Sequence, residues 1–190
     1  MGFLDALLGG GKKLKGPAPD RLFAMTTAQL TLETEAGLKH SGAASIVFQA
    51  LATGDFRGIL AETEELLRSA GEDTGTTLES ADDEFGYRWL ILRDPDFEDL
   101  VVALNTVSTQ LQGEGYGDRI LAAVFPFEEG TKRVYLIYNF KRGAYYPFVP
   151  APGQQARDTE HELRLMTQIG TELPLEQEVA RRLPLWTIPL

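Results

Sequence analysis

Apolar and small residues recur at helical spacing in two segments near the middle of the chain. One set begins at Phe56 and the other at Phe97, and both continue at offsets of 3, 4, 10, 11 and 14 residues. This spacing places the side chains on one face of a helix. Residues suited to helix ends flank the segments: Thr53 and Gly71 around the first, and Asp94, Pro95 and Gly113 around the second. Two amphipathic helices are therefore predicted, 41 residues apart.

Strand-like runs surround these two helices. They cover residues 29–34, 45–49, 76–80, 86–92, 119–127, 132–140 and 144–149. Each helix is followed by two such runs, and Glu129-Gly130 makes a hairpin turn in the second pair. Hairpins pair strands in the antiparallel sense, so the pattern predicts an α+β fold in which both helices pack on one face of an antiparallel sheet. The repeated order also fits an internal β-α-β-β duplication.

The two ends of the chain differ from this middle part, and glycine and proline mark the boundaries near residues 9–19 and 150–153. We expect an N-terminal amphipathic, basic tail with its linker over residues 1–19 and an α+β core domain over 20–150. A C-terminal helical extension, with an apolar tail packed on the core, is expected over 151–190. In this extension, Asp158 is expected to cap a helix that ends near Ile169, and Pro174 to open a short helix that ends near Arg182.

Charge and cysteine content limit the classes of function. The net charge is −10, and residues 1–16 carry three lysines against one aspartate, so the remainder carries −12. An acidic body repels phosphates, so nucleic acid is not an expected partner. The chain has no cysteine, and no apolar run approaches the roughly 20 residues of a membrane-spanning helix. We expect a cytoplasmic protein, peripheral at the inner face of the membrane if its tail binds lipid.

Few residues suited to catalysis are present. His40 and His161 are the only histidines, they lack metal-ligand spacing, and both are interpreted as surface residues. The carboxylates around Asp94 to Asp99 oppose a helix dipole, which is a sufficient structural reason for them. No catalytic, cofactor-binding or metal-binding residue is assigned, and no enzyme activity is expected.

Two segments are candidate contact sites. The N-terminal tail joins an apolar helix face to lysines, which is typical of membrane-interface or groove-binding segments. Its candidate contact residues for membrane or partner are Phe3, Leu4, Leu7, Lys12 and Lys13. The alternatives are a frayed end and packing on its own domain. The second segment, residues 138–150, combines aromatic residues with two cations, and its candidate partner-binding residues are Lys141, Arg142 and Tyr145. Alternating core aromatics would explain the same pattern.

Several of these stretches resemble the PspA-associated protein PspAB family. The similarity spans nearly the whole chain, and its most specific part is the Lys-Arg-Gly…Tyr-Pro-Phe segment at 141–148. Further matching stretches are residues 1–9, 20–24, 86–90 and 183–186. The resemblance implies a small cytosolic protein linked to PspA, a phage-shock protein that protects stressed membranes. It implies no catalytic residues and no cofactor.

The function we expect is therefore that of a non-enzymatic adaptor in the PspA-linked membrane stress response, acting through protein–protein binding. The order of elements is also similar to type III secretion chaperones and YbjN-like proteins, which implies a second function: holding an extended peptide, as a monomer or a homodimer. This is an analogy of fold alone. A third alternative is a carboxylate- or metal-dependent enzyme.

Overall fold

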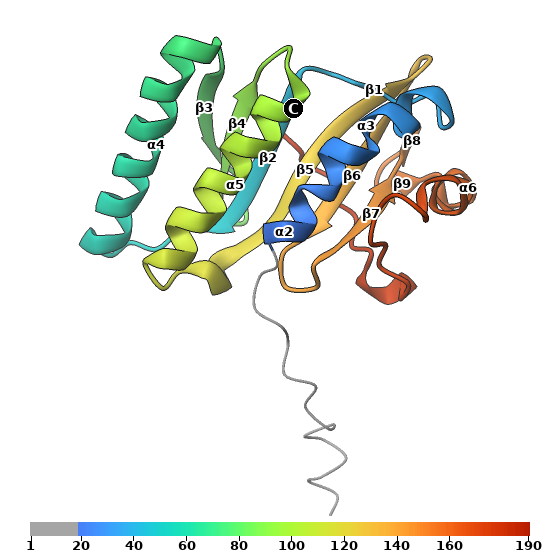
Figure 1. The fold of residues 1–190 in the computed structure, drawn as a ribbon. Helices are drawn as coiled ribbons and strands as arrows, with labels where there is room; N and C mark the ends of the chain where they lie inside the picture. The colour runs from blue at the N-terminus through green and yellow to red at the C-terminus, as the bar shows by residue number, and fades with distance from the viewer. Residues whose placement is uncertain (1–18) are drawn as a thin grey trace, which may run out of the picture.

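A seven-stranded antiparallel sheet forms the centre of the computed structural model, which describes residues 19–190 (Figure 1). The strand order is β3-β4-β2-β5-β6-β7, and the short β1 pairs with β5. The strands are β1 Lys39–His40, β2 Ala43–Gln49, β3 Thr77–Asp82, β4 Tyr87–Arg93, β5 Ile120–Glu129, β6 Lys132–Asn139 and β7 Ala144–Phe148. Strands β5 and β6 are joined through Gly130, whose φ of +61° suits the predicted hairpin turn.

Helices cover one face of this sheet (Figure 1). They are α2 Pro19–Leu22, α3 Ala24–Thr34, α4 Gly54–Thr74 and α5 Phe97–Gly113. Helix α5 buries seven residues along its inner face, among them Leu100, Leu104 and Val107, and packs on the middle of the sheet. The predicted α+β architecture, with two amphipathic helices on one face of an antiparallel sheet and a further helix towards the C-terminus, is confirmed.

The helix ends agree in part with the prediction. The Thr53 hydroxyl caps α4 by accepting the N–H of Phe56 at 3.4 Å. Asp96, and not Asp94, caps α5, since its carboxylate accepts the N–H of Glu98 at 2.9 Å. Asp94 is buried instead and accepts the hydroxyl of Thr76, which ties the start of β3 to the end of β4.

The predicted equivalence of the two helices holds only in part. Phe56 and Phe97 are both buried, as are Leu60 and Val101 four residues further on. Leu66 and Ala70 of α4 are exposed, however, whereas Val107 and Leu111 at the equivalent positions of α5 are buried. The hairpins that follow the two helices differ in their position in the sheet. Strand β2 lies between β4, the second strand of the β3–β4 hairpin, and β5, the first strand of the β5–β6 hairpin.

Two predicted elements are wrong. Residues 29–34 belong to α3 and not to a strand, because Met25, Ala28 and Leu32 face the core at helical spacing while Leu30 is 72% exposed. The helix expected from Pro174 is replaced by a short 3₁₀ turn, Val179–Arg181. The backbone at 174–176 instead completes the edge of β7: Tyr145 donates to the carbonyl of Pro174 at 2.7 Å and accepts from Glu176 at 2.8 Å.

The C-terminal residues cover part of the opposite face of the sheet. Leu185, Ile188 and Leu190 pack on buried residues of that face, which include Trp89, Tyr146 and Phe148. Side chains hold the tail in place: Arg133 donates to the carbonyl of Leu190 at 2.9 Å, and the Tyr146 hydroxyl donates to that of Leu183 at 3.0 Å.

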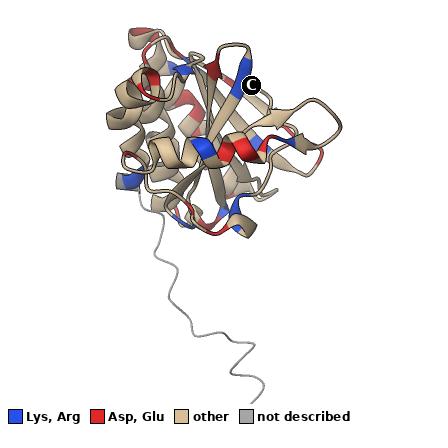
Figure 2. Ribbon diagram, turned by 90° about the vertical axis from the view of Figure 1, so that its right-hand side faces the viewer, with Lys and Arg blue, Asp and Glu red and all other residues tan. Residues whose placement is uncertain are grey.

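Helix α6, Thr159–Ile169, lies beside β7, and the short strands β8, Pro150–Ala151, and β9, Ala156–Arg157, precede it (Figure 1). As predicted, Asp158 caps α6 by accepting the N–H of His161 at 3.0 Å. Acidic and basic residues are interspersed on the side of the molecule that carries α6 (Figure 2). None of the helices within residues 19–190 combines the length and apolar character needed to cross a membrane.

Candidate functional site

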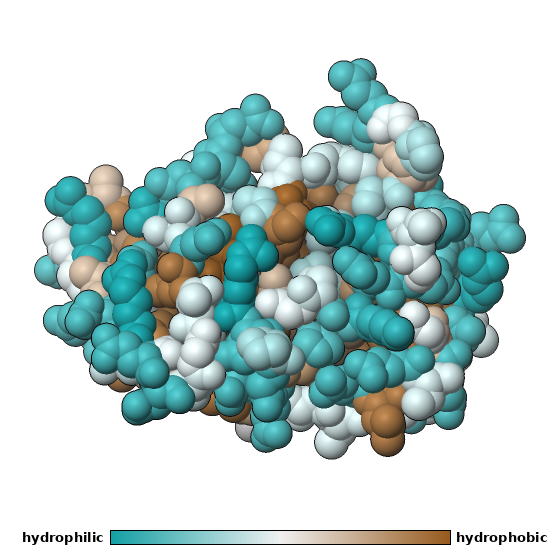
Figure 3. Space-filling view, turned by 90° about the horizontal axis from the view of Figure 1, so that it is seen from above, coloured by the Kyte–Doolittle hydropathy of each residue, from teal (hydrophilic) through white to brown (hydrophobic). Residues whose placement is uncertain are grey.

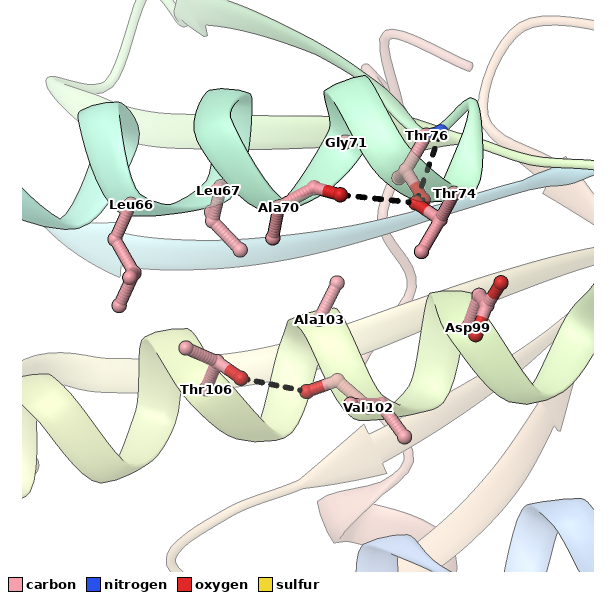
Figure 4. Close-up of a pocket in the computed structure, with 10 residues that line it drawn as sticks. All are labelled: Leu66, Leu67, Ala70, Gly71, Thr74, Thr76, Asp99, Val102, Ala103 and Thr106. Carbon is pink, nitrogen blue, oxygen red and sulfur yellow. Dashed lines mark hydrogen bonds between the residues drawn. The ribbon is translucent and has the colours of Figure 1, made fainter.

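A groove runs between α4 and α5 (Figure 4). Its volume is about 330 Å³, and we name it the helix groove; it is lined by Leu66, Leu67, Ala70, Gly71, Thr74, Thr76, Asp99, Val102, Ala103 and Thr106. Leu66, Leu67 and Ala70 point from α4 towards α5 (Figure 4). Leu66 is 50% exposed and Val102 is 45% exposed, so the helix groove presents apolar side chains to solvent.

Small residues create this space. Ala70 and Gly71 on α4 lie opposite Ala103 on α5, so few side-chain atoms fill the interval between the helices. Gly71 also permits a close approach of the backbone, because a Cβ atom there would lie only 2.1 Å from the carbonyl oxygen of Thr76. One end of the helix groove is therefore closed by the turn from α4 into β3.

The two helices that form the helix groove are acidic. Helix α4 carries six acidic and two basic residues, and α5 carries two acidic and no basic residues, so the pair has a formal charge of −6. Desolvation, followed by the neighbouring Asp96 and Asp94 carboxylates, raises the pKa of Asp99 above its usual value. An apolar groove that contains Asp99 and lies between two acidic helices suits a partner segment that carries both apolar and basic side chains.

A second groove lies on the opposite face of the sheet, and we name it the sheet groove. Its volume is about 530 Å³. The lining residues are Val47, Asp83, Glu84, Phe85, Tyr87, Trp89, Leu121, Ala122, Asn139, Lys141, Tyr146, Gln155, Leu183, Pro184, Leu185, Trp186 and Thr187. Phe85 is 69% exposed and Leu183 is 60% exposed, so this groove also presents apolar side chains to solvent. Seen from above, hydrophobic residues show mainly in hollows of a largely hydrophilic surface (Figure 3).

The three predicted partner-binding residues fall in different environments. Lys141 is exposed, lines the sheet groove and makes no hydrogen bond or ion pair with the described part of the chain. Arg142 donates through Nε to Glu176 at 3.1 Å, which fastens the segment after α6 to the turn before β7. Tyr145 is wholly buried, and its hydroxyl donates to the carbonyl of Leu22 at 2.6 Å. Tyr145 therefore faces the helix layer and has no side-chain surface exposed to solvent.

The other predicted contact residues, Phe3, Leu4, Leu7, Lys12 and Lys13, lie outside the described residues.

His161 differs from the surface residue expected, whereas His40 is partly exposed. His161 is buried, with Nε2 2.8 Å from a carboxylate oxygen of Glu129 and Nδ1 3.4 Å from the amine of Lys132. The first turn of α6 therefore packs on the β5–β6 hairpin, which the sequence spacing did not indicate. The backbone N–H of His161 and the amine of Lys132 lower the pKa of Asp158. Within residues 19–190, no group of three or more His, Cys, Asp or Glu side chains is arranged to hold a metal ion.

A family model described as PspA associated protein B (PspAB) matches residues 1–190, the whole chain. The chain belongs to the PspAB family. No curated protein and no solved structure matches it. The type III secretion chaperone analogy therefore stays a prediction, and the description of the PspAB family supports an accessory role linked to PspA.

Sequence reasoning did not find either groove of this PspAB family member. The helical spacing from Phe56 places Leu66 and Leu67, at offsets 10 and 11, on the same face, whereas in the structure Leu67 is buried and Leu66 is half-exposed. One feature of the sequence is related to the sheet groove: both tryptophans of the chain, Trp89 and Trp186, line it. Those two residues are 97 positions apart, so only the strand order and the path of the tail bring them together.

Proposed function

We propose that this protein is a non-enzymatic adaptor of the PspA-linked membrane stress response, and that it binds PspA through the helix groove. One observation carries the proposal: an apolar groove with exposed Leu66 and Val102 lies between two acidic helices. The family description, which names an association with PspA, supports the choice of partner. On this proposal the protein works in the cytoplasm, near the inner face of the membrane where PspA protects against stress.

The occupant that fits the helix groove is an amphipathic helical segment of PspA. Its apolar side chains would lie against Leu66, Ala70 and Val102, in the helix-in-groove mode of recognition. Lysine or arginine residues beside them would face Asp99 and the other carboxylates of α4 and α5. Because the two helices carry a net negative charge, the complex with a basic segment should form faster at low ionic strength than at high ionic strength.

A second candidate function, holding an extended peptide, is favoured by the edge of the sheet at β3. In the described sheet, β3 pairs with β4 on one side and has no strand on the other. An added strand could pair there through main-chain hydrogen bonds. Glu79 and Asp82 place charge on this strand, which is a common protection of an edge against pairing, so we favour the helix groove.

Replacing Val102 with aspartate should weaken PspA binding at least ~10-fold, equivalent to about 1.4 kcal/mol. The substitution places a carboxylate in the apolar groove, beside Asp99 and opposite acidic α4. Isothermal titration calorimetry with purified PspA would measure the change in Kd.

The matched control is Val179→Asp, because Val179 is 66% exposed and lies in the 3₁₀ turn, away from the lining of the helix groove. Equal weakening by both substitutions, or by neither, would remove the helix groove from the proposal. Wild-type affinity in Val102→Asp together with loss of binding in Glu79→Pro would favour the β3 edge instead.

A further inference from the structure

The sheet groove has an exposed aromatic border and a rigid turn. Phe85 stands at the tip of the β3–β4 turn and is 69% exposed. The Asp83 carboxylate accepts the backbone N–H groups of Phe85 and Tyr87, both at 2.9 Å, and the indole N–H of Trp89 at 3.1 Å. The turn therefore holds the Phe85 ring at the border of a groove that none of the described residues fills.

The N-terminal segment joins the body in the helix layer, next to a turn that borders the sheet groove. Helix α2 begins at Pro19, and Arg21 donates to the carbonyl of Gly143 at 3.2 Å, in the turn between β6 and β7. Lys141 belongs to the same turn and lines the sheet groove. Figure 1 shows α2 next to that turn, at the lower edge of the molecule. Ten residues separate Leu8 from Pro19, and an extended chain of that length spans up to about 33 Å. The apolar residues 3–8 are therefore tethered by ten residues to a point next to the turn that borders the sheet groove.

The charges at the border of the sheet groove also favour contact with the N-terminal segment. The border of the sheet groove offers Glu84 and Lys141, both exposed and neither paired with a described residue. Residues 1–16 supply opposite charges for both: lysines at 12, 13 and 15, and the carboxylate of Asp5. The segment has a side-chain charge of +2, whereas the remainder of the chain carries −12, so attraction to its own body is expected at moderate salt.

We propose that the sheet groove is the docking site of the N-terminal segment of the same chain. Phe3, Leu4 and Leu7 lie in the groove against Phe85 and Trp186, and the lysines that follow face Glu84. While it is docked, the segment is withheld from a membrane surface or another protein. Release of the segment by such a partner exposes the groove.

The two tryptophans give a direct test, because both line the sheet groove and the chain has no others. The full chain is compared with a full-length Leu4→Asp/Leu7→Asp variant. The variant's tryptophan emission should move to longer wavelength, and acrylamide should quench it more strongly, because Trp186 is then left in water. These substitutions lie outside residues 19–190, and far-UV circular dichroism would verify that the body is folded.

The matched control is Leu30→Asp, on an α3 residue that is 72% exposed and lies on the other face of the sheet. Its emission and quenching should equal those of the wild type. Identical spectra and quenching for the wild type and the Leu4→Asp/Leu7→Asp variant would overturn the proposal. A wild-type emission wavelength that changes with protein concentration would also overturn it, because the segment would then come from a second copy.

Discussion

Replacing Arg157 with alanine should lower the free energy of unfolding by about 3–5 kcal/mol, because it leaves a buried carboxylate without its partner. The Glu162 side chain is only 4% exposed. Arg157 Nε lies 3.0 Å from each carboxylate oxygen of Glu162, and its Nη2 donates to one of them. The remaining bond to Glu162 comes from the backbone N–H of Val149 at 2.9 Å, which alone cannot balance a buried charge.

Arg157 also joins three parts of the molecule. Its Nη1 donates to the carbonyl of Arg182 at 2.9 Å, and its guanidinium lies 5.7 Å from the centre of the Phe148 ring. The β7 strand, α6 and the start of the C-terminal tail therefore meet at one side chain. Its loss should loosen the tail as well as destabilise the fold.

Urea unfolding followed by circular dichroism would measure the effect. The control is Arg164→Ala, an exposed arginine on α6, which should change the free energy of unfolding by no more than about 0.5 kcal/mol. The double variant Arg157→Met/Glu162→Met should recover most of the lost stability, since it removes both charges. Equal stability of Arg157→Ala and Arg164→Ala would show that the pair does not stabilise the fold.

Replacing Gly71 with alanine should destabilise the protein by about 1–3 kcal/mol. Alanine is normally the better helix former, so the expected sign is opposite to that of helix propensity. The reason is local: the new Cβ atom would lie 2.1 Å from the carbonyl oxygen of Thr76. The Thr76 hydroxyl donates a hydrogen bond to the buried Asp94 carboxylate. The start of β3 would therefore have to move to relieve the clash between the new Cβ atom and the Thr76 carbonyl.

Gly58→Ala on the same helix is the matched control. Nothing lies within 4 Å of a Cβ atom at Gly58, so this substitution should stabilise the protein by about 0.5–1 kcal/mol. Thermal unfolding of the two variants should therefore shift Tm in opposite directions. A rise in Tm for Gly71→Ala would contradict the close contact between α4 and β3 that closes one end of the helix groove.

The sequence was most informative where local signals agreed. Apolar spacing over about four turns located α4 and α5. The capping residues Thr53 and Asp158 marked the starts of α4 and α6. The β5–β6 hairpin was found because a glycine turn separates two apolar runs. In each of these cases the deciding interactions lie within a few residues of one another along the chain.

Long-range contacts account for most of what the sequence did not predict. In α3, Leu30 and Leu32 fit a strand period, whereas Met25, Ala28 and Leu32 fit helical spacing, and the burial of Leu32 with exposure of Leu30 decides between the two. Tyr145 and Tyr146 are adjacent and both aromatic, yet the first faces the helix layer and the second the sheet groove. Such differences depend on strand order and on which face each neighbour covers.

The most direct test of PspA binding through the helix groove is methyl-resolved NMR during a titration with PspA. The methyl signals of Leu66, Ala70 and Val102 should shift or broaden, whereas that of Val179 should stay unchanged. Unchanged helix-groove signals at saturating PspA, with or without changes elsewhere, would contradict this central claim.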